Sequence, residues 1–219
     1  MSVNTQPETI SEARSRILSE IGAGTTLVAA SKRQSEDRIE AALAAGQRVF
    51  GENRVQEAQS RWQDRRGLHS GLELRLIGPL QTNKAEDAVR LFDVIETLDR
   101  EKLLNALIKA VEKTGAAAPD LLIQVNTGEE PQKGGVVTDE LEPLLTQARQ
   151  TYPGSIVGLM CIPPAAEPAA PHFALLKRLA DQFALPTVSM GMSSDYALAA
   201  RLGATHVRVG TAFFGARET

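Results

Sequence analysis

Residues 187–215 read TVSMGMSSDYALAARLGATHVRVGTAFFG. Two short apolar runs, TVSMG and HVRVG, enclose an amphipathic stretch, and each run ends in a glycine turn followed by a helix start. Apolar runs separated by amphipathic stretches are typical of strand–helix–strand units. The stretch therefore predicts two strands joined by a helix, with a second helix after the last strand.

The same unit recurs along the whole chain. Six earlier runs have the same character, namely TLVAAS, RVFGE, LRLIG, FDVIET, LLIQVN and IVGLM. Their apolar residues are nearly continuous, which is typical of parallel strands covered on both faces. Eight units of about 25 residues account for about 200 residues, at the lower end for closed eight-stranded barrels. We predict one (β/α)8 barrel domain over residues 1–219, with an open doubly wound sheet as the structural alternative.

Helix boundaries follow from capping residues and apolar spacing. We expect Asp99 to cap a helix that ends near Gly115, and Ser35 to open the helix after the first strand. The first 18 or so residues predict an additional helix, whose apolar side carries Ile10, Ala13, Ile17, Leu18 and Ile21. We expect this helix to plug the amino-terminal end of the barrel.

Composition excludes several classes of protein. With 42% hydrophobic residues, 23% charged residues and a net charge of -3, the chain has the profile of a soluble globular protein. It lacks the excess of lysine and arginine that a broad nucleic-acid surface needs. Cys161 is the one cysteine, so neither an internal disulfide nor a cysteine zinc cluster is possible. Without a signal peptide or a membrane-length apolar run, we expect a cytoplasmic protein with no metal site, and a monomer.

Barrels carry their functional residues at the carboxyl ends of the strands. The residues that follow the eight runs are Ser31 and Lys32, Glu52 and Asn53, Gly78 and Pro79, Thr97, Asn126 and Thr127, Cys161, Met190 to Ser194, and Gly210 and Thr211. Lys32 is notable because it follows a nearly apolar strand. Burial would lower its pKa and favour the neutral amine that Schiff-base chemistry needs. A lysine that extends from the strand end into water is the alternative.

The last two strands end in small residues and hydroxyls. Backbone N–H groups at two helix starts, with the hydroxyls of Ser193 and Thr211, predict an anion site, and barrels often bind phosphate here. Alternatively, the two hydroxyls only cap helices and Gly191 and Gly210 only permit turns. Arg208 points into the barrel or onto the helix layer; its partner is then a surface-helix carboxylate or an acceptor on a bound cofactor.

Six segments together resemble one family, the YggS/PROSC-type pyridoxal phosphate homeostasis proteins, over about residues 26 to 217. They are AASKRQ, FGENRVQEA, LIGPLQTNK, LLIQVNTGEEPQKGGV, GLMCIPP and SMGMSSDYALAARLGATHVRVGTAFFGAR. The resemblance implies a barrel like the N-terminal domain of alanine racemase, which holds pyridoxal 5′-phosphate (PLP). Two departures are visible: Pro79 stands where relatives commonly have histidine, and Arg33 where they commonly have threonine.

The resemblance also implies roles for individual residues. Lys32 would hold PLP as an internal aldimine. Ser193, Gly210 and Thr211 would lie at the phosphate, and Arg208 at the pyridine nitrogen. Asn53 and Ser189 would line the pocket. Intracellular PLP and amino-acid homeostasis is the implied function, with PLP-requiring apo-enzymes as possible recipients of the cofactor.

Residue chemistry favours a carrier over an enzyme, so we assign no catalytic residue. An arginine at the pyridine nitrogen keeps that atom unprotonated and weakens the ring as an electron sink. Racemisation needs a second base, and Cys161 and Tyr196 are weak candidates. His69, His172 and His206 are expected on the opposite side of the barrel.

Three alternatives remain at this point. One is a PLP-dependent amino-acid racemase-like enzyme. Another is an aldolase-like barrel that forms a Schiff base with a sugar phosphate. The third is a barrel that binds a phosphate ligand without covalent chemistry. The glycine-containing loop GEEPQKGG after the fifth strand permits closure over the site but does not require it.

Overall fold

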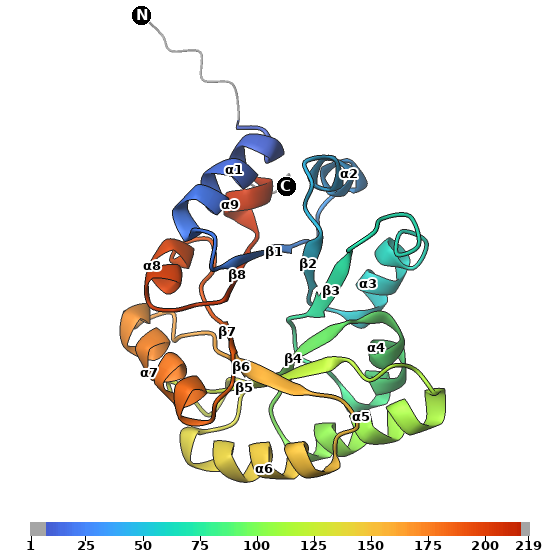
Figure 1. The fold of residues 1–219 in the computed structure, drawn as a ribbon, viewed down its shortest axis with the longest axis vertical. Helices are drawn as coiled ribbons and strands as arrows, with labels where there is room; N and C mark the ends of the chain where they lie inside the picture. Colours follow the sequence, from blue (N-terminus) through green and yellow to red (C-terminus); the bar gives the residue numbers. More distant parts are fainter. Residues whose placement is uncertain (1–7, 216–219) are drawn as a thin grey trace, which may run out of the picture.

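Eight parallel strands form a closed barrel in the computed structural model, which describes residues 8–215 (Figure 1). They follow one another around the barrel in sequence order: β1 (Thr26–Ala30), β2 (Val49–Glu52), β3 (Glu73–Leu76), β4 (Val94–Leu98), β5 (Asp120–Gln124), β6 (Ile156–Met160), β7 (Thr187–Ser189) and β8 (His206–Val209). Each strand coincides with a predicted run. Because β8 pairs with β1, the barrel prediction is confirmed and the open sheet is excluded.

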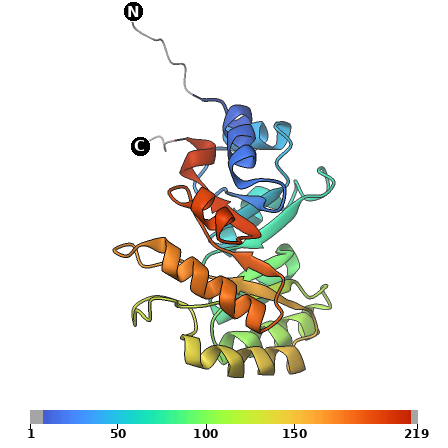
Figure 2. The same cartoon turned by 60° about the vertical axis from the view of Figure 1, so that its left-hand side comes forward.

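Helices surround the strands, as two views of the molecule show (Figures 1 and 2). They are α1 (Ile10–Ile21), α2 (Glu36–Ala44), α3 (Val55–Trp62), α4 (Ala85–Leu91), α5 (Glu101–Thr114), α6 (Leu141–Thr151), α7 (Ala169–Gln182), α8 (Tyr196–Arg201) and α9 (Thr211–Phe214), with short 3-10 helices η1 (Thr82–Lys84) and η2 (Thr138–Glu140). None of the helices within residues 8–215 has the length and apolar character to cross a membrane.

The predicted end of helix α5 is correct, whereas its predicted N-cap residue is not. Its buried face carries Leu103, Leu104 and Leu107, and the helix stops where Gly115 takes a left-handed φ of 64°, as predicted. The expected cap is wrong, because Arg100 holds the N-cap position and Asp99 pairs with the guanidinium of Arg100 instead. Ser35 does hold the N-cap position of α2, although its side chain makes no capping hydrogen bond.

Helix α1 lies in the outer ring of helices and not at the end of the barrel (Figure 1). Its N-cap Thr9 and Glu12 form a capping box, and it packs on α2, α8 and α9. The reason is that α9 has only 4 residues, so α1 covers the strands beside it. The expectation that this helix plugs the barrel is therefore wrong; its part before residue 8 lies outside the described residues.

Candidate functional site

The seven candidate site residues fall on four strands that are consecutive around the closed barrel. Ser189 ends β7 and Ser193 lies in the turn after it. Arg208 is on β8, which Gly210 and the first residue of α9, Thr211, follow. Lys32 follows β1, and Asn53 follows β2. Because carboxyl ends of parallel strands meet at one rim, these residues share one side of the barrel mouth. The fold thus brings together a lysine, an arginine, hydroxyls and a glycine turn from separate parts of the sequence.

Ser193 is held by backbone donors at the end of β8. Its Oγ accepts hydrogen bonds from the N–H groups of Gly210 at 3.3 Å and Ala212 at 3.2 Å. The backbone of Gly210 runs beside β1, where an added Cβ would lie 3.6 Å from the Cβ of Ala30. Two backbone N–H groups and a hydroxyl therefore converge at this point, which fits both the capping contact and the anion site expected from the sequence.

Lys32 lies at the mouth, but its side chain is exposed. The apolar strand ends before it, and Lys32 sits in the turn that leads to α2. Its position after the first strand is as predicted, and of the two alternatives that the sequence left open, a buried lysine and one that extends into water, the exposed side chain agrees with the second. It opens onto a cavity of about 260 Å³, whose lining is Lys32, Arg33, Asn53, Arg54 and Glu57.

Arg208 points into the barrel interior. Its Nη1 donates to Ser189 Oγ at 2.7 Å and its Nη2 to the carbonyl oxygen of Cys161 at 2.8 Å. The side chain is nearly completely buried. These hydrogen-bond partners come from β7 and from the end of β6, and Glu96 Oε2 on β4 lies 4.0 Å from Nη1. The surface-helix carboxylate that the sequence left open is not among the partners of Arg208 in the described residues.

A buried ion pair, which the sequence analysis missed, lies below Arg208. Arg75 on β3 donates from Nε to Glu96 Oε1 at 2.5 Å, and Ser189 Oγ donates to Glu96 Oε2 at 2.6 Å. Burial alone would raise the pKa of Glu96, but the charges of Arg75 and Arg208 and the hydrogen bond from Ser189 outweigh it and lower this pKa. Opposite charges inside the apolar runs of two adjacent strands were the signal that could have revealed the pair.

The remaining candidates for proton transfer are occupied or misplaced. Burial raises the pKa of the Cys161 thiol to about 12. Tyr196 packs against α1, where its hydroxyl bonds to Arg16 and Glu20. The predicted location of His172, on the side of the barrel opposite the mouth, is wrong. Helix α7 starts at the carboxyl end of the barrel, and His172 Nδ1 lies 3.1 Å from Thr127 Oγ1.

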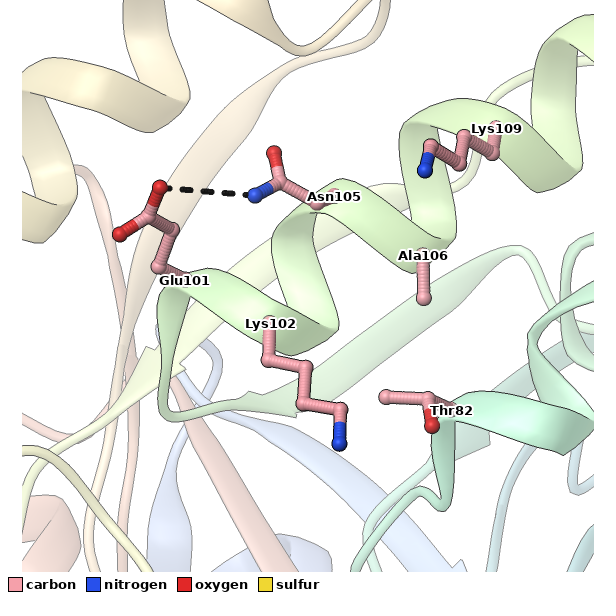
Figure 3. A pocket seen from close by; sticks show the side chains of 6 residues that line it. All are labelled: Thr82, Glu101, Lys102, Asn105, Ala106 and Lys109. Carbon is pink, nitrogen blue, oxygen red and sulfur yellow. Dashed lines mark hydrogen bonds between the residues drawn. The ribbon is translucent and has the colours of Figure 1, made fainter.

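Two further cavities are present, one at the mouth and one on the outer surface. One of about 730 Å³ adjoins the Lys32 cavity through Asn53 and Arg54 and is also lined by Pro79, Lys84 and Arg100. Another of about 460 Å³ opens on the outer surface, between η1 and the start of α5, where the side chains of Lys102 and Lys109 extend (Figure 3). This outer cavity holds none of the candidate site residues.

Known proteins resemble this chain over nearly its full length. Residues 12–218 match the family model described as alanine racemase, N-terminal domain. A pyridoxal phosphate homeostasis protein of Aquifex aeolicus (strain VF5) is 38% identical over 201 residues, which cover 88% of this chain and 87% of that protein. The solved structure of an alanine racemase of Clostridium difficile 630 is 12% identical with a TM-score of 0.77, covering 96% of this chain and 57% of that one, so it shares the fold.

The structure of PipY from Synechococcus elongatus PCC7942 without PLP is also similar. It is 38% identical, with a TM-score of 0.87, and the match covers 94% of this chain and 100% of that one. PipY with PLP bound has a TM-score of 0.85 at the same identity and the same coverage. The chain therefore belongs to the alanine racemase N-terminal domain family and, within it, to the pyridoxal phosphate homeostasis proteins.

Proposed function

We propose that this protein binds PLP as a Schiff base on Lys32 and serves intracellular PLP and amino-acid homeostasis as a carrier, without substantial catalytic turnover. The whole chain would act as one cytoplasmic domain, a monomer that passes PLP to apo-enzymes. The observation that carries the proposal is that Lys32 follows β1 while Gly210, which donates to Ser193 Oγ, follows β8, the strand paired with β1. The PLP-bound structure of the related PipY supports it.

The residues at the mouth fit the chemical groups of PLP. The N–H groups of Gly210 and Ala212 donate to Ser193 Oγ in this structure, and phosphate oxygens would take the place of that acceptor, with the hydroxyls of Ser193 and Thr211 as further donors. Asn53 lines the Lys32 cavity, and its buried Oδ1 has no hydrogen-bond partner in the described part of the chain, so it is free to accept one from a ligand. Arg208 would face the ring nitrogen, with Ser189 beside it.

Bound PLP supplies a reactive aldehyde and an electron-accepting ring. Arg208 limits the second property, because a guanidinium keeps its protons at physiological pH and can only donate. Its hydrogen bonds to Ser189 and to the Cys161 carbonyl hold it in one orientation. The chain's own groups therefore suit storage of an aldehyde better than proton removal from a bound amino acid.

Uptake and transfer of PLP test the proposal. We expect the cofactor-free protein to take up one PLP and to deliver it to a PLP-requiring apo-enzyme, while Lys32→Ala does neither. Assays for amino-acid racemisation and for aldol cleavage of a sugar phosphate run beside these. Racemase turnover at the level of a true racemase, lost in Lys32→Ala, would contradict the carrier proposal and favour the enzyme alternative.

A further inference from the structure

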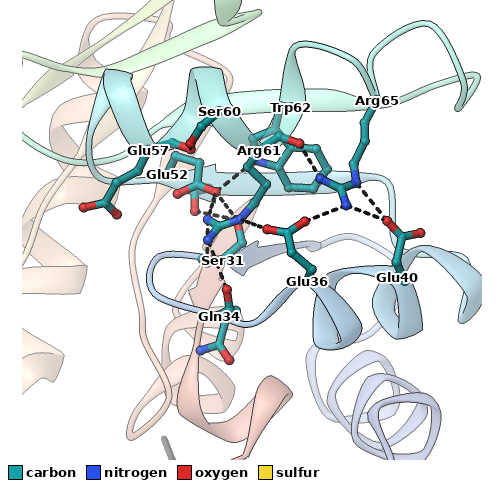
Figure 4. A network of polar contacts seen from close by, with 11 residues as sticks. Ser31, Gln34, Glu36, Glu40, Glu52, Glu57, Ser60, Arg61, Trp62 and Arg65 are labelled. Atoms are coloured by element: carbon teal, nitrogen blue, oxygen red, sulfur yellow. Dashed lines mark hydrogen bonds and ion pairs between the residues drawn. The ribbon is translucent and has the colours of Figure 1, made fainter.

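One guanidinium group bridges the turn that carries Lys32. Arg61, at the end of α3, donates from Nη1 to the carbonyl oxygen of Ser31 at 3.0 Å and from Nη2 to that of Gln34 at 3.1 Å (Figure 4). Ser31 and Gln34 are the first and last residues of a four-residue turn, which the Gln34 N–H closes on the Ser31 carbonyl at 3.2 Å. Arg61 thus contacts both ends of the segment whose middle residues are Lys32 and Arg33.

Arg61 is itself anchored by a buried carboxylate on β2. Glu52 Oε1 accepts from Arg61 Nη1 at 2.7 Å, from Ser31 Oγ at 2.8 Å and from Trp62 Nε1 at 2.9 Å. Glu52 is completely buried, and the side chain of Arg61 is only 10% exposed. A buried ion pair with several hydrogen bonds holds its members in a narrow range of positions. The position of the turn is thereby tied to the barrel wall.

Other contacts also hold the two ends of the turn, but they do not reach its middle. Ser31 is completely buried and its N–H donates to the carbonyl oxygen of Gly51 at 2.9 Å, and Gln34 Oε1 accepts from Arg38 Nη1 at 3.3 Å. The side chains of Lys32 and Arg33 are both exposed, and neither makes a hydrogen bond or an ion pair within residues 8–215. Arg33 also has a φ of 57°, in the left-handed region that non-glycine residues rarely adopt. Such a conformation persists when its surroundings impose it. Through its hydrogen bonds to the carbonyl oxygens of Ser31 and Gln34, Arg61 is one of the groups that impose it here.

We propose that Arg61, held by Glu52, is a positioning residue that fixes the turn from Ser31 to Gln34 so that Lys32 is presented to the cofactor. This role rests on the proposed attachment of PLP to Lys32. Through the turn, Arg61 would influence the affinity for PLP and the time for which PLP stays bound, although it lies outside the cofactor pocket. A carrier that must both hold and release its cargo depends on such a constraint.

Arg65 supplies a matched control. It lies one turn further along the chain, with a side chain 20% exposed, and it pairs with Glu36 and Glu40 of α2 (Figure 4). Its Nη1 donates to the carbonyl oxygen of Arg61, and its partner Glu36 also lies 3.8 Å from Arg61 Nε. Within residues 8–215, Arg65 makes no hydrogen bond or ion pair with the turn itself. Arg65→Gln therefore removes a comparable interhelical arginine and leaves the hydrogen bonds to Ser31 and Gln34 in place.

The test compares Arg61→Gln, Arg61→Lys and Arg65→Gln with the wild type. In cofactor-free protein, we expect the Gln34 amide to exchange with deuterium at least about tenfold faster in Arg61→Gln than in Arg65→Gln. In PLP titrations, we expect the Kd of Arg61→Gln to rise by about tenfold, with Arg65→Gln within about twofold of the wild type. Arg61→Lys keeps the positive charge beside Glu52, so the same two measurements are made on this variant if Arg61→Gln does not fold.

The two readouts separate this inference from the proposed function. Should wild-type protein fail to take up PLP, the proposed function falls, and the exchange of the Gln34 amide still decides whether Arg61 orders the turn. Equal effects of Arg61→Gln and Arg65→Gln on amide exchange and on PLP affinity, at equal losses of Tm, would overturn the positioning role.

Discussion

Arg208 donates a 2.7 Å hydrogen bond to Ser189 Oγ, which in turn donates a 2.6 Å hydrogen bond to the buried carboxylate of Glu96. These hydrogen bonds connect β8 through β7 to β4 across the barrel interior. Because Glu96 also pairs with Arg75, the arginine proposed to face PLP belongs to one connected polar network. Substitutions deep in the barrel should therefore also affect the cofactor site at the mouth.

Removing the carboxylate of Glu96 is expected to destabilise the fold strongly. The side chain of Arg75 is 4% exposed, so Glu96→Ala leaves its guanidinium buried without this carboxylate. We expect the free energy of unfolding to fall by about 3–5 kcal/mol. Glu73→Ala is the control, because Glu73 pairs with the same arginine but is 38% exposed, and it should cost less than about 1 kcal/mol. Urea unfolding at neutral pH measures both. Similar losses for the two variants would argue against the buried network.

His206 should make stability depend on pH. Burial, aided by the charge of Arg75, lowers its pKa from 6.5 to about 4. The unfolded chain therefore binds a proton that the folded chain excludes, so the stability present above about pH 6.5 is lost as the pH falls towards 4. The loss amounts to at most about 3 kcal/mol. Unfolding free energies between pH 7 and pH 4 should fall less steeply in His206→Gln; identical slopes would contradict the assignment.

Gly191 is expected to tolerate no side chain. Its φ is 92°, and an added Cβ would lie 2.5 Å from the Cβ of Ala199. Gly22 also has a positive φ, of 73°, but an added Cβ there meets nothing within 4 Å. Gly22→Ala should cost about 1 kcal/mol, and Gly191→Ala about 3 kcal/mol because overpacking adds to the backbone strain. Thermal unfolding distinguishes them, and equal shifts in Tm would contradict the close contact.

Ser193 should discriminate phosphorylated from unphosphorylated ligand. Ser193→Ala removes a hydroxyl proposed to contact the phosphate, so we expect about a tenfold weaker Kd for PLP and little change for pyridoxal. Ser194→Ala alters the exposed neighbouring serine and should leave both affinities as in the wild type. Fluorescence titration with the two ligands provides the measurement. An equal loss for PLP and pyridoxal would place Ser193 away from the phosphate.

The strands were predictable because local and tertiary requirements agree in them. Runs such as LLIQVN are apolar nearly throughout, which suits a strand buried on both faces. The strand ends could therefore be located, and with them Lys32, Ser193 and Gly210. The meeting of Ser193 with Gly210 followed from the rule that carboxyl ends of barrel strands share one rim.

Other features depend on contacts between distant residues. The apolar strand before Lys32 left open whether this lysine is buried or extends into water, and the structure decides for exposure because the strand ends at Ala30 and the turn carries the lysine outward. Helix α1 was misplaced because its own apolar spacing does not show that its packing partners are α2, α8 and α9. The ion pair of Glu52 with Arg61 joins β2 to the end of α3, and no pattern in the sequence around either residue predicts this pairing.

The central claim is that Lys32 is the residue that carries PLP, and trapping with borohydride tests it most directly. Purified protein is incubated with PLP, its absorption is recorded from about 300 to 500 nm before and after reduction, and the digested product is mapped by mass spectrometry. We predict a visible band that disappears on reduction and a reduced PLP adduct on Lys32, both absent in Lys32→Ala. An adduct on other lysines alone, or a protein that stays colourless with added PLP, would contradict the claim.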